Sequence, residues 1–270
     1  MLYTLRGLVL DMGHAECSEA SCASIGKDPA RSRALRAAVA ARMVTWPTCT
    51  YAEYKKEKLM RLILIRHGES LHSQRRMIAG VASCPGLTAR GFEQSRILAR
   101  RLEETGELRD ATQLLSSPVL RARQTAEILA PCLPQCRLSE DIRLSELLPG
   151  DADGLLWQEY VSRYEAFDLV TEPDRPFAPG GESWQDFGTR VHAMLNEMIG
   201  VYAQQTVVGI THAGFIVMAM LELFSIPRPG TGTRIDPSFT SLTEWQYSNA
   251  EWQLLRFNDI AHLQEHSGSL

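Results

Sequence analysis

Short apolar runs alternate with longer amphipathic stretches from Met60 onward. The apolar runs predict strands at residues 60–65, 113–115, 137–138, 206–210, 242–247 and 252–257. The amphipathic stretches predict helices at residues 88–104, 118–130, 156–167, 183–204 and 213–224. Strands that alternate with helices in this way are typical of a three-layer α/β/α sandwich with a mostly parallel central sheet.

Residues 1–59 do not share this pattern. They show no strand alternation, and only the Ala/Arg-rich stretch at residues 28–44 has helical character. We therefore expect a poorly ordered or weakly structured N-terminal extension, followed by one domain over residues 60–270. A second hypothesis is a mis-assigned start, with the native chain beginning at Met60, because a purine-rich coding tract for residues 55–58 can resemble a ribosome-binding site. Peptides from residues 1–59 in the endogenous protein would contradict that hypothesis.

Composition and charge argue against several classes of protein, among them nucleic-acid-binding and membrane proteins. Hydrophobic residues make up 44% of the chain and charged residues 22%, so a sizeable core is available. Residues 60–270 carry nineteen Lys/Arg against twenty-six Asp/Glu, an acidic balance that argues against nucleic-acid binding. No apolar run approaches the roughly 20 residues that span a bilayer, so we expect no membrane partner. The six cysteines lack the paired spacing of a zinc site, which favours reduced thiols in a cytoplasmic protein.

The polar residues at the ends of the predicted strands carry the candidate chemistry. Arg66 and His67 follow the first apolar strand, and His212 follows the strand at 206–210. The strand at 113–115 leads to Arg121 near the start of a helix. Ligands of parallel sheets bind outside the carboxyl ends of the strands, so we expect these side chains to converge on one crevice. Two arginines, two imidazoles and helix amino termini suit a phosphate dianion.

These motifs together resemble the histidine phosphatase superfamily, on its phosphoglycerate mutase-like branch. The matching segments are Arg66-His67-Gly68-Glu69-Ser70, Leu87-Thr88 with Gly91 and Gln94, Ser117 to Ala126, Leu144-Ser145-Glu146 with Gly150 and Gly154, Gly180-Gly181-Glu182-Ser183, and Thr211-His212-Ala213-Gly214. They stand in the order of the family over nearly all of residues 60–257. The resemblance implies the phosphoglycerate mutase-like fold and phosphoryl-transfer chemistry.

The resemblance also implies a role for each matching residue. His67 is expected to be the nucleophile that forms a phosphohistidine, and Glu146 to protonate the leaving oxygen and then activate water. Arg66, Arg121 and His212 are expected to hold the phosphoryl oxygens. Positive side chains would stabilise the transferred group, so we expect no metal and no cofactor.

Several acidic and basic residues compete for these roles. In the acid-phosphatase branch an Asp follows the second histidine, but this chain has Ala213, which favours Glu146 as the acid and leaves Glu69 as the alternative. His72 lies in a loop from which it could touch substrate. The residues expected to be solvated or structural are Asp151, Asp153, Arg123, His14, His192, His262 and His266.

Departures from the family pattern bear on the reaction. Ser73 stands where many relatives have an Asn that supports the phosphate site, so its phosphate contact is expected to be weaker. Leu147-Leu148-Pro149-Gly150 replaces the Arg-His-Tyr-Gly of dedicated phosphoglycerate mutases. These differences favour a phosphomonoester hydrolase acting on a small phosphorylated metabolite. A mutase, a narrow phosphatase of the α-ribazole or sugar-phosphate type, and a non-catalytic phospholigand-binding or scaffold protein stay open.

The sequence determines neither the substrate nor the oligomeric state. A homodimer is one of the open alternatives. We expect specificity to come from the loop at 70–85 and from the insertion at 155–179.

Overall fold

A computed structural model of the chain describes residues 59–165, 167–169, 171–227 and 234–264. The chain divides into two units, Met1–Lys55 and Lys56–Leu270, and the described residues all belong to the second unit. The prediction of a weakly structured N-terminal extension falls on residues 1–58, outside the described residues, as does that for His14. His266 also lies outside the described residues.

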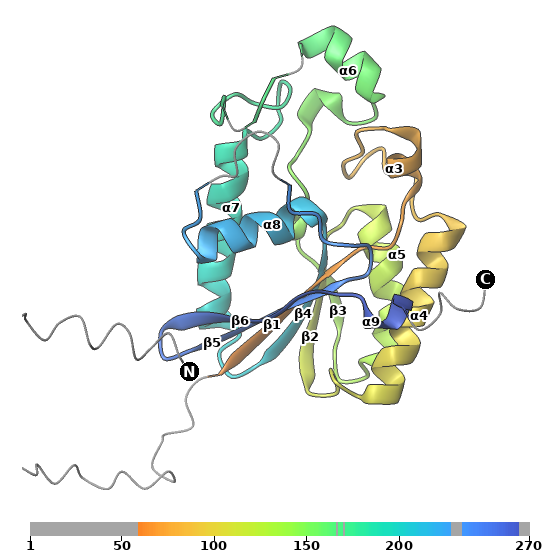
Figure 1. Ribbon diagram of the computed structural model, residues 1–270, viewed down its shortest axis with the longest axis vertical. Coiled ribbons are helices and arrows are strands. Elements are labelled where there is room, and N and C mark those ends of the chain that lie inside the picture. The colour runs from red at the N-terminus through yellow and green to blue at the C-terminus, as the bar shows by residue number, and fades with distance from the viewer. Residues whose placement is uncertain (1–58, 166, 170, 228–233, 265–270) are drawn as a thin grey trace, which may run out of the picture. The chain divides into compact units, whose positions relative to one another are not determined.

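A mixed six-stranded sheet forms the centre of the second unit (Figure 1). Its strands are β1 (Met60–Arg66), β2 (Ala111–Ser116), β3 (Leu138–Glu140), β4 (Thr206–Thr211), β5 (Leu242–Ser248) and β6 (Glu251–Asp259). They lie in the order β3-β2-β4-β1-β5-β6, in which the first four strands are parallel, β5 is antiparallel to β1, and β6 is antiparallel to β5. The parallel strands direct their carboxyl ends to one edge of the sheet, which is where the predicted site residues follow.

Helices cover both faces of this sheet. The longer helices are α4 (Ala89–Thr105), α5 (Leu120–Leu129), α7 (Trp184–Val201) and α8 (Ala213–Leu223), and the shorter ones are α3 (Leu71–Arg75), α6 (Trp157–Tyr164) and α9 (Ala261–Gln264). In Figure 1, α7 and α8 lie on one side of the sheet, and α4 and α5 lie on the other. The predicted three-layer α/β/α architecture is therefore confirmed.

Alternating side chains of β1 explain the two outer layers. Leu62 and Leu64 belong to one buried cluster with Phe187 of α7. Ile63 and Ile65 belong to a second cluster that packs against α4 and α5. Successive residues of a strand point to opposite faces, so a continuously apolar strand fits only between two apolar layers.

Local signals set several element ends where the sequence predicted them. The Thr88 side chain accepts a hydrogen bond from Gly91 N (2.9 Å) at the start of α4. Ser183 and Asp186 form a reciprocal capping box at the start of α7. Asn249 and Ala250 both have positive φ between β5 and β6, which is the backbone of a tight hairpin turn. A difference lies at residues 71–75, where the structure has α3 instead of the expected loop.

The described residues contain neither a membrane-spanning helix nor a cluster of metal-binding side chains. None of the described helices combines the length and apolar character needed to cross a bilayer. The described residues also contain no group of three or more His, Cys, Asp or Glu side chains arranged to hold a metal ion.

Candidate active site

The two predicted histidines meet where β1 and β4 end. The strands are parallel neighbours with Arg66 opposite Thr211, so the next residue of each strand lies at the same edge of the sheet. A hydrogen bond from His67 N to Thr211 O (2.9 Å) extends this pairing by one residue. The imidazole centroids of His67 and His212 are 5.1 Å apart, and both side chains are buried. The convergence expected from the sequence is confirmed.

Arg121 of α5 joins the two imidazoles. Its Nε donates to Nε2 of His67 (3.0 Å), and its Nη2 lies 3.0 Å from Nδ1 of His212. A guanidinium has only donors, so both of these ring nitrogens must be unprotonated acceptors. The remaining ring nitrogens then carry hydrogen and donate, from His67 Nδ1 to Gly68 O (2.7 Å) and from His212 Nε2 to Ser117 Oγ (2.9 Å).

Burial and neighbouring cations keep these imidazoles neutral. Burial lowers the pKa of His67 well below its usual range, and the positive charges of Arg121 and Arg66 lower it further. The pKa of His212 is likewise lowered by burial first and by Arg121 second. A neutral imidazole is the nucleophilic form, so the protonation state of His67 suits a nucleophilic role once Arg121 releases the lone pair of Nε2.

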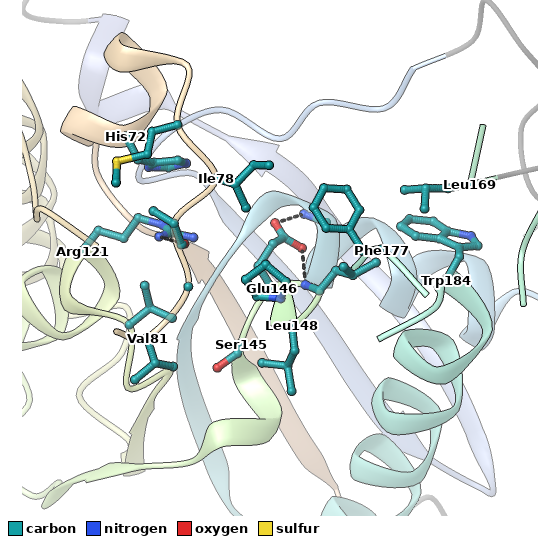
Figure 2. Close-up of a pocket in the computed structure, with 17 residues that line it drawn as sticks. His72, Ile78, Val81, Arg121, Ser145, Glu146, Leu148, Leu169, Phe177 and Trp184 are labelled. Atoms are coloured by element: carbon teal, nitrogen blue, oxygen red, sulfur yellow. Dashed lines mark hydrogen bonds between the residues drawn. The ribbon is translucent and has the colours of Figure 1, made fainter. Parts of the chain in front are cut away.

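Glu146 approaches the site from the loop after a short 3-10 turn. Its Oε2 accepts from Gly214 N (2.9 Å) in the first turn of α8, and its Oε1 accepts from Leu147 N (3.3 Å) (Figure 2). A Cβ at position 214 would lie 2.1 Å from Glu146 Oε1, so a larger residue there would displace the carboxylate from this position. Backbone amides at a helix amino terminus favour a carboxylate, which fixes Glu146 in this position.

A cavity of about 360 Å³ opens beside these residues. Its polar lining includes His72, Arg121, Ser145 and Glu146. Most of the remaining lining is apolar: Met77, Ile78, Ala79, Val81, Val119, Leu147, Leu148, Pro149, Leu169, Phe177 and Trp184. Figure 2 shows Glu146 between Arg121 and His72 on one side and Phe177 and Trp184 on the other. The volume is near the lower end of the roughly 300–1,000 Å³ typical of small-molecule sites.

A family model described as histidine phosphatase superfamily (branch 1) matches residues 62–260. The chain belongs to the histidine phosphatase superfamily. The probable phosphoglycerate mutase GpmB of Salmonella typhi is 28% identical over 219 residues, which cover 76% of this chain and 95% of that protein.

Solved structures share the fold of this chain. The phosphoserine phosphatase of Entamoeba histolytica, crystallised with 3-phosphoglyceric acid, has a TM-score of 0.63 at 23% identity, over 76% of this chain and 99% of that one. The phosphoglycerate mutase of Bacillus anthracis has a TM-score of 0.62 at 20% identity, over 77% and 97%. These likenesses confirm the phosphoglycerate mutase-like fold.

Arg66 lies beside His67 but has other partners among the described residues. Its guanidinium stacks on Phe239 at 4.0 Å and contacts Pro237 O and Asp236 (3.3 Å). Its Nε is buried without a hydrogen-bond partner among the described residues. The phosphate contact that membership of the histidine phosphatase superfamily suggests for Arg66 stays a prediction, and this unpaired donor is the atom available for it.

Ser73 and Glu69 do not reach the cavity. Ser73 is exposed on α3 and is absent from the cavity lining, so its expected phosphate contact has no geometric support in this arrangement. Glu69 accepts hydrogen bonds from Thr88 Oγ1 (2.9 Å) and Gln74 Nε2 (3.1 Å), which tie it to the start of α4. This position disfavours Glu69 as the alternative acid.

His72 lies at the cavity, as expected of a residue that could touch substrate, whereas Asp153 differs from its expected surroundings. His72 lines the cavity, contacts Ser70 Oγ and lies with its ring centroid 6.2 Å from that of His67. Burial and the nearby arginines lower the pKa of His72 to about 3. Asp153 was expected on a solvated loop, but it is half-buried and accepts from Gly80 N (2.7 Å) and Ala82 N (3.1 Å). Asp153 fixes one edge of the cavity, because its carboxylate accepts hydrogen bonds from the backbone of the loop at residues 80–82.

The other histidines and Arg123 occupy structural or surface positions. Arg123 is exposed and pairs with Glu140 (3.1 Å), and His192 is exposed beside Glu222. His262 is buried against Thr240. These placements agree with the expectation that none of the three reaches the site.

The ion pair of Arg190 and Glu182 is a feature that the sequence reasoning missed. The two side chains form two contacts of 2.6 and 2.7 Å and are both largely buried. Arg190 also donates to carbonyl oxygens within residues 143–146, including Glu146 O (3.2 Å). Glu182 accepts from Leu148 N (2.8 Å) on the other side of Glu146. The pair therefore holds the backbone that carries Glu146. The Gly-Gly-Glu-Ser motif marked Glu182, whereas no local signal marked Arg190.

Proposed function

We propose that this chain is a metal-independent phosphomonoester hydrolase that acts on a small phosphorylated metabolite through a phosphohistidine at His67. Membership of the histidine phosphatase superfamily supports an enzyme of the phosphatase or mutase kind. The observation that carries the proposal is the 3.0 Å contact between Arg121 Nε and the unprotonated Nε2 of His67. It places a neutral nucleophile beside a guanidinium, and phosphoryl transfer depends on this combination of positioning and charge.

The reaction would proceed in two displacements. In the first, His67 Nε2 attacks phosphorus, the P–O bond to the leaving group breaks, and the protonated carboxyl of Glu146 gives its proton to the leaving oxygen. In the second, Glu146 takes a proton from water, the water oxygen attacks phosphorus, and the P–N bond breaks. Inorganic phosphate and the free imidazole result. The same carboxyl group therefore serves as the acid in the first step and as the base in the second.

Positive charge for the transferred phosphoryl group would come from this chain. Arg121 would exchange its contacts with the imidazoles for contacts with phosphoryl oxygens, and Arg66 Nε would provide a further donor. A phosphate dianion offsets the charge of Arg121, so binding would favour protonation of His212 at Nδ1. His212 would then donate to an oxygen while Ser117 keeps its ring in place.

A phosphoglycerate mutase-type transfer is the second candidate, because GpmB, at 28% identity, is named a probable phosphoglycerate mutase. A mutase would need priming by a bisphosphorylated compound and would yield an isomer instead of free phosphate. Product analysis therefore separates the two reactions directly.

The covalent step is tested with His67→Ala in the full-length chain and His192→Ala as the matched control, since His192 is exposed on α7. Phosphate release from a panel of phosphomonoesters should fall at least about 10³-fold in His67→Ala and stay unchanged in the control. Labelled substrate should leave an acid-labile phosphoryl group on His67. Unchanged turnover by His67→Ala would reject the mechanism. Absence of both turnover and label in the unmodified chain would favour the non-catalytic phospholigand-binding alternative.

A further inference from the structure

The cavity is polar at one end and apolar over the rest of its lining. The polar end comprises Arg121 and Glu146, with His67 and His212 behind Arg121. The apolar wall comprises Met77, Ile78, Val81, Leu148, Phe177 and Trp184. Figure 2 shows Phe177 and Trp184 on the far side of Glu146 from Arg121, with Ile78 between His72 and Phe177 and with Val81 beside Arg121. A substrate whose phosphoryl group lies at the polar end would therefore place its leaving group against the apolar wall.

Among the described lining residues, the charged side chains leave no partner for a second anionic group. Arg121 and Glu146 are the charged side chains among the described lining residues. The N–H groups of Arg121 face His67, His212, Ala79 O (2.9 Å) and Cys84 Sγ (3.4 Å), at the polar end. A carboxylate on the leaving group would meet apolar side chains and the carboxyl group of Glu146. Burial of a charge without a partner is strongly unfavourable.

The apolar wall is braced from outside the cavity. Phe177 stacks on Tyr160 with ring centroids 4.4 Å apart, and Tyr160 Oη donates to Phe177 O (2.8 Å). Asp153 ties the segment that carries Val81, through Gly80 N and Ala82 N. These contacts hold the wall in place before any ligand arrives, so its apolar character is a property of a preformed site.

We propose that this cavity selects phosphomonoesters whose leaving group is uncharged and largely apolar, such as an aryl or branched alkyl alcohol, over esters whose leaving group carries a carboxylate or a second phosphate. The inference rests on the proposed function, because it assumes that the phosphoryl group lies at the polar end. The volume of about 360 Å³ suits a leaving group of a few carbon atoms or one ring.

The decisive comparison uses two esters that differ by one charge, phenyl phosphate and 4-carboxyphenyl phosphate. The value of kcat/KM should be about 10- to 100-fold higher for phenyl phosphate, because an unpaired buried carboxylate carries a penalty of this size. The carboxylate makes the phenolate a slightly better leaving group, so intrinsic reactivity works against this result. 3-Phosphoglycerate and phosphoserine, which also carry a carboxylate, should be poor substrates for the same reason.

A charge placed on the wall should change the preference. Val81 lies at the rim of the cavity and is 46% exposed, so Val81→Lys can keep its apolar stem at the rim and extend its ammonium group toward the leaving group. This variant should raise relative turnover of 4-carboxyphenyl phosphate about tenfold. Val201→Lys is the matched control, since Val201 is an exposed valine at the end of α7 and absent from the cavity lining. The control should keep the original preference.

The outcomes separate this inference from the proposed function. His67-dependent phosphate release that is equal for the two aryl esters, or higher for 4-carboxyphenyl phosphate or 3-phosphoglycerate, overturns the inference and leaves the hydrolase intact. Preference for phenyl phosphate that survives in His67→Ala overturns the phosphohistidine mechanism. Absence of His67-dependent release from every ester in the panel overturns both.

Discussion

The polar end and the apolar wall of the cavity are built from different parts of the chain. At the polar end, His67 and His212 directly follow parallel strands, and Arg121 lies in the first turn of the helix after a third strand. The apolar wall comes from the first residue of α7, Trp184, and from irregular segments at residues 77, 78, 81, 148 and 177. Strand register fixes the first set of side chains, whereas loop packing fixes the second.

This difference separates chemistry from specificity. The pairing of β1 and β4 at the centre of the sheet fixes the backbone positions from which the two imidazoles extend. Wall residues such as Val81 and Leu148 can be exchanged without touching that pairing. Catalytic geometry is thereby tied to the most constrained backbone, and substrate choice to the least constrained.

The largest effect in this comparison should follow from Arg121→Ala at the polar end. Loss of the guanidinium removes the contacts to both imidazoles and the main positive charge for the phosphoryl group, so kcat should fall about 10³-fold. Arg123→Ala is the matched control on the same helix, because Arg123 is exposed and pairs with Glu140. Steady-state phosphate release measures both. A loss below tenfold in Arg121→Ala would show that the polar end does not depend on this arginine.

A smaller effect should follow from Arg190→Met, which acts on the loop between the two ends. Without Arg190 the backbone of Glu146 loses its donors and Glu182 loses its partner, so kcat should fall about 10- to 100-fold while KM changes little. The variant should also lose about 3–5 kcal/mol of unfolding free energy, since a largely buried carboxylate is left unpaired.

Arg101→Met is the control for that variant. Arg101 of α4 is, like Arg190, largely buried and pairs with Asp259 of β6 (2.6 Å), and it is absent from the cavity lining. It should lower stability without lowering kcat of the folded protein. Equal kcat losses in the two variants would mean that Arg190 acts through stability alone and does not position Glu146.

The smallest effect concerns His72, at the boundary of the polar end and the wall. Its pKa falls from 6.5 to about 3, so between these values the unfolded chain binds more protons than the folded chain. The free energy of unfolding therefore rises with pH, and the His72 contribution is complete above pH 6.5 and lost as pH falls. His72→Gln should reduce this slope by up to about 1.4 kcal/mol per pH unit. Denaturant unfolding between about pH 4 and 6 measures the slope, and identical slopes would contradict a neutral, half-buried His72.

Much of the polar end was predictable because its signals are local. Apolar runs predict β1 and β4, and the residues that follow each run can be identified in the sequence itself. Parallel strands then bring these residues together at one edge of the sheet. His67, His212, Arg121 and Glu146 all reach the site as expected. The predicted caps at Thr88 and Ser183 are equally local, since each involves residues three positions apart.

The features that the sequence reasoning missed depend on contacts between distant positions. Arg190 lies 44 residues from Glu146, and Asp153 lies 73 residues from Gly80. No periodicity marks such pairs, because their partners are backbone atoms of irregular segments. Arg66 stood at the expected strand end, yet its turn toward Pro237 and Phe239 depends on a segment more than 170 residues away.

The sequence alone determined the order of strands and helices and which chemical groups leave the sheet at its carboxyl edge, because both follow from residues next to each other along the chain. The tertiary structure decided the tautomers of the imidazoles, the ion pair of Arg190 and Glu182 that holds the backbone of Glu146, and the apolar wall. Each of these results from burial, and burial depends on which distant segments pack together.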